Sequence, residues 1–411
     1  MKELSKREDR RGFLKKGAAG LGAMVMFPAV AQEKSEPETP RTPEKPKAQP
    51  IMTRPLGKTG LTLPVLSMGC GACDNPEVVR AALDAGVVHL DTAWNYGNGA
   101  NETMIAEVIK GRPRESYVIG TKVPGGPENR RAGVYTADAK AGPFIEKFEE
   151  SLKRLKLDYV EIFYLHCTVT REATLWEEYL NAMQKLKKDG KIRLIGVTTH
   201  ANEPEVIRAA VESKVYDVVL TAYNFRQPHV AEMKAAIAEA AKAGLGVVAM
   251  KTQAGIYWDR ERQRMINMKA ALKWVLQDEN VHTAIPGFNT FDQLELDLAT
   301  VEDLKFSPEE KKDLDLGDNL GLPGLYCPQC KDCREQCPKG VDVPTLMRSY
   351  MYAYGYRNLR SAKTALDSVA LDDMPCDECA ICSVACRMGF DVKSKIQDIA
   401  RLRALPREFV A

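Results

Sequence analysis

The sequence predicts an α/β protein, a (β/α)8 TIM barrel with a small helical C-terminal domain, and three observations support this. Short apolar stretches alternate with amphipathic helical stretches between residues 52 and 304. Eight such strands over about 250 residues are typical of a closed barrel. Eight of the eleven cysteines lie beyond residue 320, where the alternation has ended. We therefore expect a barrel at residues 51–320 and a separate domain at residues 321–411.

The barrel elements follow in order after a predicted hairpin at residues 54–63, which turns at Gly57 and Gly60. Apolar residues at helical spacing are clearest at Phe144–Leu155, Leu175–Leu186 and Val230–Ala243. The expected strands are Val65–Gly69, Val87–Thr92, Tyr117–Val123, Val160–Cys167, Leu194–His200, Asp217–Asn224, Leu245–Thr252 and Thr283–Gly287.

The first 50 residues read as a leader and a linker. Arg10 and Arg11 precede Gly-Phe-Leu-Lys, an uncharged stretch follows, and Ala29-Val30-Ala31 offers a cleavage site. This resembles a bacterial twin-arginine signal peptide over residues 1–31, which predicts export of a folded protein to the periplasm. The apolar part is too short to span a bilayer, so we expect no transmembrane anchor after processing. Residues 32–50 are rich in proline and poor in apolar side chains, which predicts a disordered linker.

The cysteines beyond residue 320 form two runs with the spacing C-x2-C-x2-C-x3-C. In two-cluster ferredoxins the first three cysteines of such a run bind one 4Fe-4S cluster and the fourth binds the other. We therefore expect two 4Fe-4S clusters in a ferredoxin-type domain. The predicted ligand sets are Cys327, Cys330, Cys333 and Cys386 for one, and Cys376, Cys379, Cys382 and Cys337 for the other.

Structural zinc and disulfides are the alternatives for these cysteines. Zinc sites usually use two separated C-x2-C pairs, in which the third evenly spaced cysteine of each run has no role. The second run also departs from the ferredoxin pattern, because Arg387 stands where proline is usual. A charge at this position would tune the potential of one cluster.

Four polar residues fall at the carboxyl ends of successive strands, where barrel enzymes place their chemistry. Asp91 ends the second strand, Tyr96 lies in the loop after it, Lys122 ends the third strand and His166 ends the fourth. Each alone has an ordinary structural explanation, such as a helix cap or a packed core residue. Together at one end of the barrel they form a candidate catalytic site.

The segments around these residues resemble the aldo/keto reductase family. The matching motifs are HLDTAWNYG at 89–97, IGTKV at 119–123, FYLHC at 163–167 and IRLIGVTTH at 192–200. The likeness covers residues 51–305, and members with an iron-sulfur extension continue it to about residue 400. The resemblance implies that Tyr96 donates a proton, that Lys122 and Asp91 assist it, and that His166 orients a carbonyl. Independently, an adjacent ammonium should lower the pKa of the Tyr96 phenol.

The resemblance also implies an NAD(P) site on the same face of the barrel. The residues that it places there are Thr198, Thr199, Tyr223, Asn224, Met250, Lys251, Pro286, Gly287, Asn289 and Thr290. No basic residue lies between Pro286 and Lys305, where one would pair with the 2′-phosphate of NADP, and Asp292, Glu295 and Asp297 lie there instead. The choice between NADP, NAD and no nucleotide therefore stays open.

Two functions follow from these residues. The first is an oxidoreductase that interconverts a small carbonyl and an alcohol by hydride transfer, relays electrons through the clusters and meets a redox partner protein. The alternative is an exported electron-transfer or docking protein that uses the barrel as a scaffold. The net charge is +2 and no long basic run lies outside the leader, so we expect no nucleic-acid partner.

Two smaller features remain. Cys70 and Cys73 form a C-x2-C pair, and Cys167 follows His166. A packed thiol is the ordinary explanation for each of the three, and the alternative is that Cys70 and Cys73 pair or react in an oxidising compartment. Four tyrosines between residues 350 and 356 lie between the two cysteine runs and are expected to pack a helix.

Overall fold

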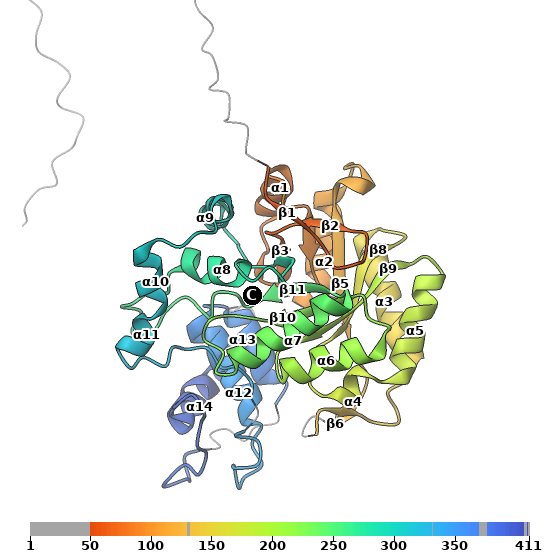
Figure 1. Cartoon of the computed structure of the whole chain (residues 1–411). Coiled ribbons are helices and arrows are strands. Elements are labelled where there is room, and N and C mark those ends of the chain that lie inside the picture. The colour runs from red at the N-terminus through yellow and green to blue at the C-terminus, as the bar shows by residue number, and fades with distance from the viewer. Residues whose placement is uncertain (1–49, 130–131, 331, 370–375, 407–408, 410–411) are drawn as a thin grey trace, which may run out of the picture. The chain divides into compact units, whose positions relative to one another are not determined.

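Eight parallel strands form a barrel at the centre of the protein, which confirms the predicted fold class (Figure 1). The computed structural model describes residues 50–129, 132–330, 332–369, 376–406 and 409. The strands, in the order of the sheet, are β3 (Met68–Gly69), β4 (His89–Asp91), β5 (Val118–Pro124), β8 (Val160–His166), β9 (Ile192–Thr199), β10 (Val218–Ala222), β11 (Gly246–Met250) and β12 (Thr283–Ala284). Leu66, just before β3, pairs with Ala284 of β12, so the first and last strands meet.

A hairpin precedes the barrel, as predicted. Strands β1 (Thr53–Pro55) and β2 (Thr62–Pro64) pair antiparallel, and Gly57 and Gly60 take positive φ angles in the turn between them. A second hairpin, β6 (Glu128–Asn129) and β7 (Val134–Tyr135), lies in the loop after β5. The central strands are buried on both faces, which is the reason that their sequences are continuously apolar.

The helices of the barrel region lie between its strands and continue beyond the last one. They are α1 (Pro76–Asp84), α2 (Ala100–Ile109), α3 (Ala141–Leu155), α4 (Arg171–Thr174), α5 (Glu177–Lys188), α6 (Glu203–Ser213), α7 (Val230–Ala243), α8 (Met268–Leu276), α9 (Phe291–Glu302), α10 (Pro308–Leu314) and α11 (Leu316–Asn319). Side-chain caps such as Asn75 on α1 and Thr290 on α9 set where several of them begin. Together, strands and helices alternate as the apolar pattern predicts.

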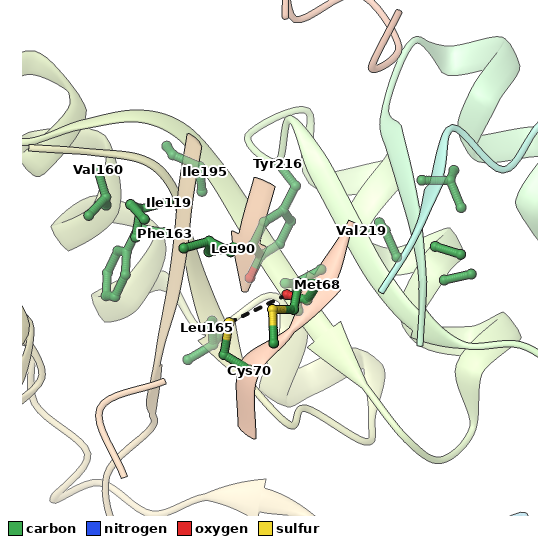
Figure 2. Packing of buried hydrophobic residues seen from close by; sticks show 14 of the residues in the cluster. Met68, Cys70, Leu90, Ile119, Val160, Phe163, Leu165, Ile195, Tyr216 and Val219 are labelled. Atoms are coloured by element: carbon green, nitrogen blue, oxygen red, sulfur yellow. Dashed lines mark hydrogen bonds between the residues drawn. The ribbon is translucent and has the colours of Figure 1, made fainter. Parts of the chain in front are cut away.

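The barrel has two apolar layers. Inside the barrel, Leu56 of the first hairpin packs with strand residues such as Tyr164 and Leu220. Outside it, the strands pack against the surrounding helices, and Figure 2 shows part of this layer around Cys70, with Met68 and Leu165 beside it. The Cys70 thiol donates a hydrogen bond to Met68 O at 3.7 Å.

The region after residue 320 is helical and carries the two cysteine runs in loops. Its helices are α12 (Val343–Tyr350), which continues into a turn of π-helix (Met351–Gly355), α13 (Leu359–Asp367) and α14 (Val392–Ala400). A small core that includes Leu346, Phe390 and Ile396 holds these helices together, and cysteines from both runs pack against it.

This C-terminal region contacts the loop that follows β11. Ile256 N donates a hydrogen bond to Gly355 O at 2.8 Å, and Arg260 pairs with Asp398 at 2.5 Å. The predicted signal peptide and linker lie outside the described residues. Within the described ranges, no helix has the length and apolar character needed to cross a bilayer.

The packing inside the barrel gives a stability prediction. A Cβ atom at Gly196 on β9 would lie 2.2 Å from Cδ1 of the buried Tyr164 ring. Gly196→Ala should therefore lower the free energy of unfolding by about 2 kcal/mol, as overpacking of a closed core typically does. Anaerobic denaturant titration followed by circular dichroism measures this change.

The control is Gly142→Ala, which adds the same methyl group on α3 with no heavy atom within 4 Å of it. It should leave the free energy of unfolding unchanged or raise it by about 0.5–1 kcal/mol. Equal stability of the two variants would show that the ring does not fill the barrel as described.

Candidate active site

A buried ion pair lies at the carboxyl end of the barrel. Lys122 on β5 donates to the carboxylate of Asp91 on the neighbouring strand β4 and to Thr92 O, the latter at 2.6 Å. Both side chains are almost fully buried, at 1–2% exposure. Burial alone would lower the pKa of Lys122, but Asp91 and Tyr96 raise it overall, so the ammonium stays charged.

Tyr96 and His166 lie next to this pair. Lys122 Nζ is 4.9 Å from the centre of the Tyr96 ring, and the His166 ring meets the Tyr96 ring edge-on with centres 6.1 Å apart. Gly71 leaves room for the phenol, because a Cβ there would lie 2.8 Å from the Tyr96 ring. The structure thus brings together all four residues of the candidate catalytic site.

The Lys122 ammonium was expected to lower the pKa of Tyr96, but burial of the phenol has the larger, opposite effect. Burial raises the pKa of Tyr96 to about 12, although Lys122 acts in the opposite direction. Burial, together with the charges of Lys122 and Arg348, lowers the pKa of His166 to about 3. Lys122 therefore acts in the predicted direction, but burial is the larger effect and the net pKa of Tyr96 is raised. Both side chains are neutral over the physiological range, and each can donate a hydrogen bond.

The eight cysteines gather into two groups of four. After burial, the neighbours that raise the pKa of Cys333 include Cys327, Cys330 and Cys386, and those that raise the pKa of Cys376 include Cys379, Cys382 and Cys337. These are the two sets that the ferredoxin spacing predicts.

The donor set of each group suits an iron-sulfur cluster. Burial and the neighbouring thiols raise the pKa of Cys327 to about 11 and that of Cys333 to about 12, so they would stay protonated unless a metal took their thiolates. Gln329 donates a hydrogen bond to Cys327 Sγ at 3.2 Å, a contact of the kind that tunes cluster potentials. Four thiols per group match the four ligands that a 4Fe-4S cluster needs.

The segment between the two cysteine runs reaches the catalytic end of the barrel. Tyr352 in the π-helical turn accepts a hydrogen bond from Lys251, which follows β11, at 3.3 Å. Lys251 Nζ also lies 4.7 Å and 5.8 Å from the ring centres of Tyr352 and Tyr356. Tyr352 is also close enough to Tyr96 to make a small contribution to its raised pKa, after the larger effect of burial. Side chains of the C-terminal region therefore form part of the candidate site.

Most residues expected to bind a nucleotide near β9–β11 are buried and already have partners. Thr198 accepts a hydrogen bond from Cys167 N at 2.8 Å, and Thr199 donates to Ala201 O at 2.8 Å. Asn224 donates to Lys251 O at 3.1 Å and also contacts Tyr326 of the C-terminal region.

Two further residues of this set, Tyr223 and Met250, belong to the apolar layers of the barrel. Tyr223 donates to the Asp278 carboxylate at 3.0 Å and lies against Trp274 with the two rings tilted by 50°, and Met250 packs in the barrel interior. Neither of them adds to the polar groups of Thr198, Thr199 and Asn224. A nucleotide at β10–β11 would have to replace the contacts of Lys251 and Asn224 with the C-terminal region.

The segment after β12 lies at the edge of the barrel. Pro286 is buried and its carbonyl accepts a hydrogen bond from the β3 backbone at 3.0 Å, whereas Gly287, Asn289 and Thr290 are exposed at the start of α9. Asp297, expected to repel a phosphate, is buried within α9, and burial raises its pKa to about 7.

Sequence reasoning missed the residues of the C-terminal region that reach the site. The tyrosines between residues 350 and 356 were expected only to pack a helix, and Tyr350 and Tyr354 do stack, with centres 4.4 Å apart. Tyr352 and Arg348 face the barrel instead. The only signal for this in the sequence is the i, i+4 spacing of these two residues.

Cys167 and His200 also lie at the site. Cys167 has a positive φ of 64°, which is uncommon for a residue other than glycine and is often found near functional sites. Cys70 and Cys73 are buried free thiols with raised pKa values, caused first by burial, and they belong to the apolar layer outside the barrel.

Comparison with known proteins places the barrel in a family. Residues 73–270 match the model of the aldo/keto reductase family. L-glyceraldehyde 3-phosphate reductase of Escherichia coli O157:H7 is 25% identical over 320 residues, which cover 64% of this chain and 91% of that protein. L-galactose dehydrogenase of Arabidopsis thaliana is 33% identical over 165 residues, 36% of this chain and only 48% of that protein.

Solved structures show the same fold. Aldo-keto reductase AKR11C1 from Bacillus halodurans, in its holo form, has a TM-score of 0.52 at 24% identity and covers 65% of this chain and 96% of its own. An aldo-keto reductase from Klebsiella pneumoniae in complex with NADPH has a TM-score of 0.50 at 24% identity, over 63% of this chain and 93% of its own. The family match ends before the first cysteine run. Residues 73–270 of the chain are therefore similar to the aldo/keto reductase family, whose members are oxidoreductases.

Proposed function

We propose that the protein interconverts a small carbonyl compound and an alcohol at Tyr96, and that two 4Fe-4S clusters in its C-terminal region relay the electrons. One observation carries this proposal. The segment that joins the two groups of cysteines contacts the same barrel end at which Tyr96, Lys122, Asp91 and His166 meet.

The roles of the barrel residues follow from their charges. Tyr96 remains protonated near neutral pH and can give its proton to a carbonyl oxygen as a hydride reaches the carbon. The neutral His166 ring can donate a second hydrogen bond to the same oxygen. Lys122, held by Asp91, stabilises the negative charge that Tyr96 develops when its proton leaves. In alcohol oxidation the same groups act in reverse.

The cofactors would supply the electrons. A nicotinamide would carry hydride, and 4Fe-4S clusters would take up or release single electrons. NADPH is bound by the Klebsiella pneumoniae relative. In this chain Lys251 and Asn224 contact the C-terminal region, so a nucleotide can occupy β10–β11 only after these contacts open.

The contacts of Lys251 and Asn224 with the C-terminal region are also compatible with the second candidate function, an exported electron-transfer or docking protein without nicotinamide chemistry. The observation that favours it is the packing of Tyr326 and Met351 against Ala254, next to the predicted nucleotide residues. The intact group of Tyr96, Lys122, Asp91 and His166 favours the enzyme, and a redox partner would exchange electrons with the clusters in either function.

Export remains part of the proposal. The leader at residues 1–31 and the linker at residues 32–50 would carry the protein out through the twin-arginine route, which transports folded proteins. A protein with preassembled clusters requires such a route, and we place its work in the periplasm.

Replacing Tyr96 tests the catalytic role. Tyr96→Phe removes the proton donor and should lower the rate of carbonyl reduction by about 10²–10⁴-fold. A panel of small aldehydes, supplied anaerobically with either reduced methyl viologen or NADPH, measures the rate and shows which donor feeds the site. Tyr159→Phe, just before β8 and so at the opposite end of that strand from His166, is the matched control and should keep the wild-type rate.

An active Tyr96→Phe variant would exclude the proposed proton transfer. Absence of turnover with both electron donors for every aldehyde would favour the docking function instead.

The pH dependence of the same reaction follows from the two pKa values. Burial raises the pKa of Tyr96 to about 12 and lowers that of His166 to about 3, so we expect both to keep one protonation state between pH 5 and 10. The rate of carbonyl reduction should be flat over this range and fall only as pH approaches 12, where Tyr96 loses its proton. A pKa between 6 and 9 that disappears in Tyr96→Phe would contradict this assignment.

Pairs of cysteine variants test the two clusters. The intact protein should hold about eight irons and eight sulfides after anaerobic purification. Cys330→Ser combined with Cys386→Ser removes two ligands of one group and should leave about four irons. Cys337→Ser combined with Cys386→Ser removes one ligand from each group and should leave fewer irons. Iron and sulfide analysis with electron paramagnetic resonance measures these values, and stoichiometric zinc in the intact protein would refute the clusters.

A further inference from the structure

The barrel mouth contains a lysine without a carboxylate partner. Lys251 follows β11 in a backbone conformation with φ of 54°, and it is half-buried. Its ammonium donates to Tyr352 and lies over two tyrosine rings, and no ion pair joins it to any described residue. A partly buried cation is usually paired with an anion, and the partners of Lys251 among the described residues are neutral, so its charge is free to bind an anionic ligand.

Arg348 faces the same place from the C-terminal region. It lies on α12 four residues before Tyr352, so the two side chains share one face of the helix, and Tyr352 is fixed at the barrel mouth by Lys251. The Arg348 side chain is half-buried, yet its guanidinium makes neither a hydrogen bond nor an ion pair within the described ranges. A guanidinium that carries five donors rarely remains unpaired when it is partly removed from water.

The two cations border the catalytic residues. The charge of Arg348 acts on His166, Cys167 and His200, and that of Lys251 acts on Cys167 and His200. The His166 and His200 rings lie with their centres 6.5 Å apart. Lys122 is the third cation near the site, but Asp91 neutralises it. The mouth therefore carries an excess of two positive charges beside the reacting groups.

We propose that Arg348 and Lys251 bind an anionic group, a carboxylate or a phosphate, on the carbonyl or alcohol substrate. A guanidinium binds such a planar or branched anion through two parallel hydrogen bonds, and the ammonium adds a third. Tyr352 holds Lys251 in place. This inference rests on the proposed function, which it deepens by naming the substrate as an oxo acid, a hydroxy acid or a phosphorylated counterpart.

Two other occupants fit the charges less well. The ligand atoms of His166, Cys167 and His200 lie within 4.8 Å of one another, a donor set that suits zinc. Three neighbouring cations would repel a metal ion there, and only Lys122 of them is neutralised. The pyrophosphate of a nucleotide is also anionic, but it would have to approach past Tyr326 and Asn224, which contact each other.

Calorimetric binding to the full-length, anaerobically purified protein tests the proposal. The probes are malonate and inorganic phosphate, with malonamide as the neutral counterpart of malonate. We expect the anions to bind and malonamide not to bind. Arg348→Gln and Lys251→Gln should each weaken malonate binding by about 10- to 100-fold, the usual effect of losing one charge-assisted hydrogen bond. Arg357→Gln removes the same charge from an exposed position of the same segment and should bind malonate like the wild type.

Several outcomes would overturn the proposal. The first is equal affinity for malonate and malonamide, and the second is an unchanged malonate affinity in both Arg348→Gln and Lys251→Gln at wild-type iron content. The third is binding of ADP-ribose that depends on Arg348 and excludes malonate. The fourth is one bound equivalent of zinc that is lost in Cys167→Ser. Binding requires no turnover. Failure here therefore leaves the Tyr96→Phe result untouched, and failure of Tyr96→Phe leaves the anion site standing.

Discussion

The ion pair between Lys122 and Asp91 is the interaction on which the catalytic end of the barrel depends. An ammonium buried to this degree must have a charged partner, because removing that partner leaves an uncompensated charge that typically costs about 3–5 kcal/mol. The pairing of β4 with β5 brings the two side chains together at the carboxyl ends of their strands. Tyr96 then lies over a fixed positive charge, so the proposed proton donor is in place before any substrate arrives.

The C-terminal region provides the rest of the mouth. Tyr326, Met351 and Tyr352 contact the loops that follow β10 and β11. The π-helical turn at residues 351–355 shifts the helix register where it meets the barrel, and such turns often occur at functional sites. The C-terminal region and the candidate catalytic residues therefore share one surface.

Much of the barrel was predictable from the sequence because strands buried on both faces leave a continuous apolar signal. The positions of Asp91, Tyr96, Lys122 and His166 followed from the strand ends. The raised pKa of Tyr96 did not follow from the sequence, because its largest cause is burial, which depends on how the whole site packs and outweighs the lowering by Lys122. Arg348 could not be predicted, since its role depends on how two regions dock, and no spacing in the chain encodes that. The clusters, the nucleotide and the export route stay predictions.

The segment that carries Arg348 and Tyr352 is tethered on both sides by cysteines of different groups, Cys337 before it and Cys376 after it. Metal loading of both groups would pin its two ends, and loss of either would release one of them. A chain that is only partly loaded with iron would then have a mobile segment beside Tyr96. A protein that lacks the proposed clusters would then also lack an ordered substrate site. Cluster assembly and catalytic activity would therefore be gained together.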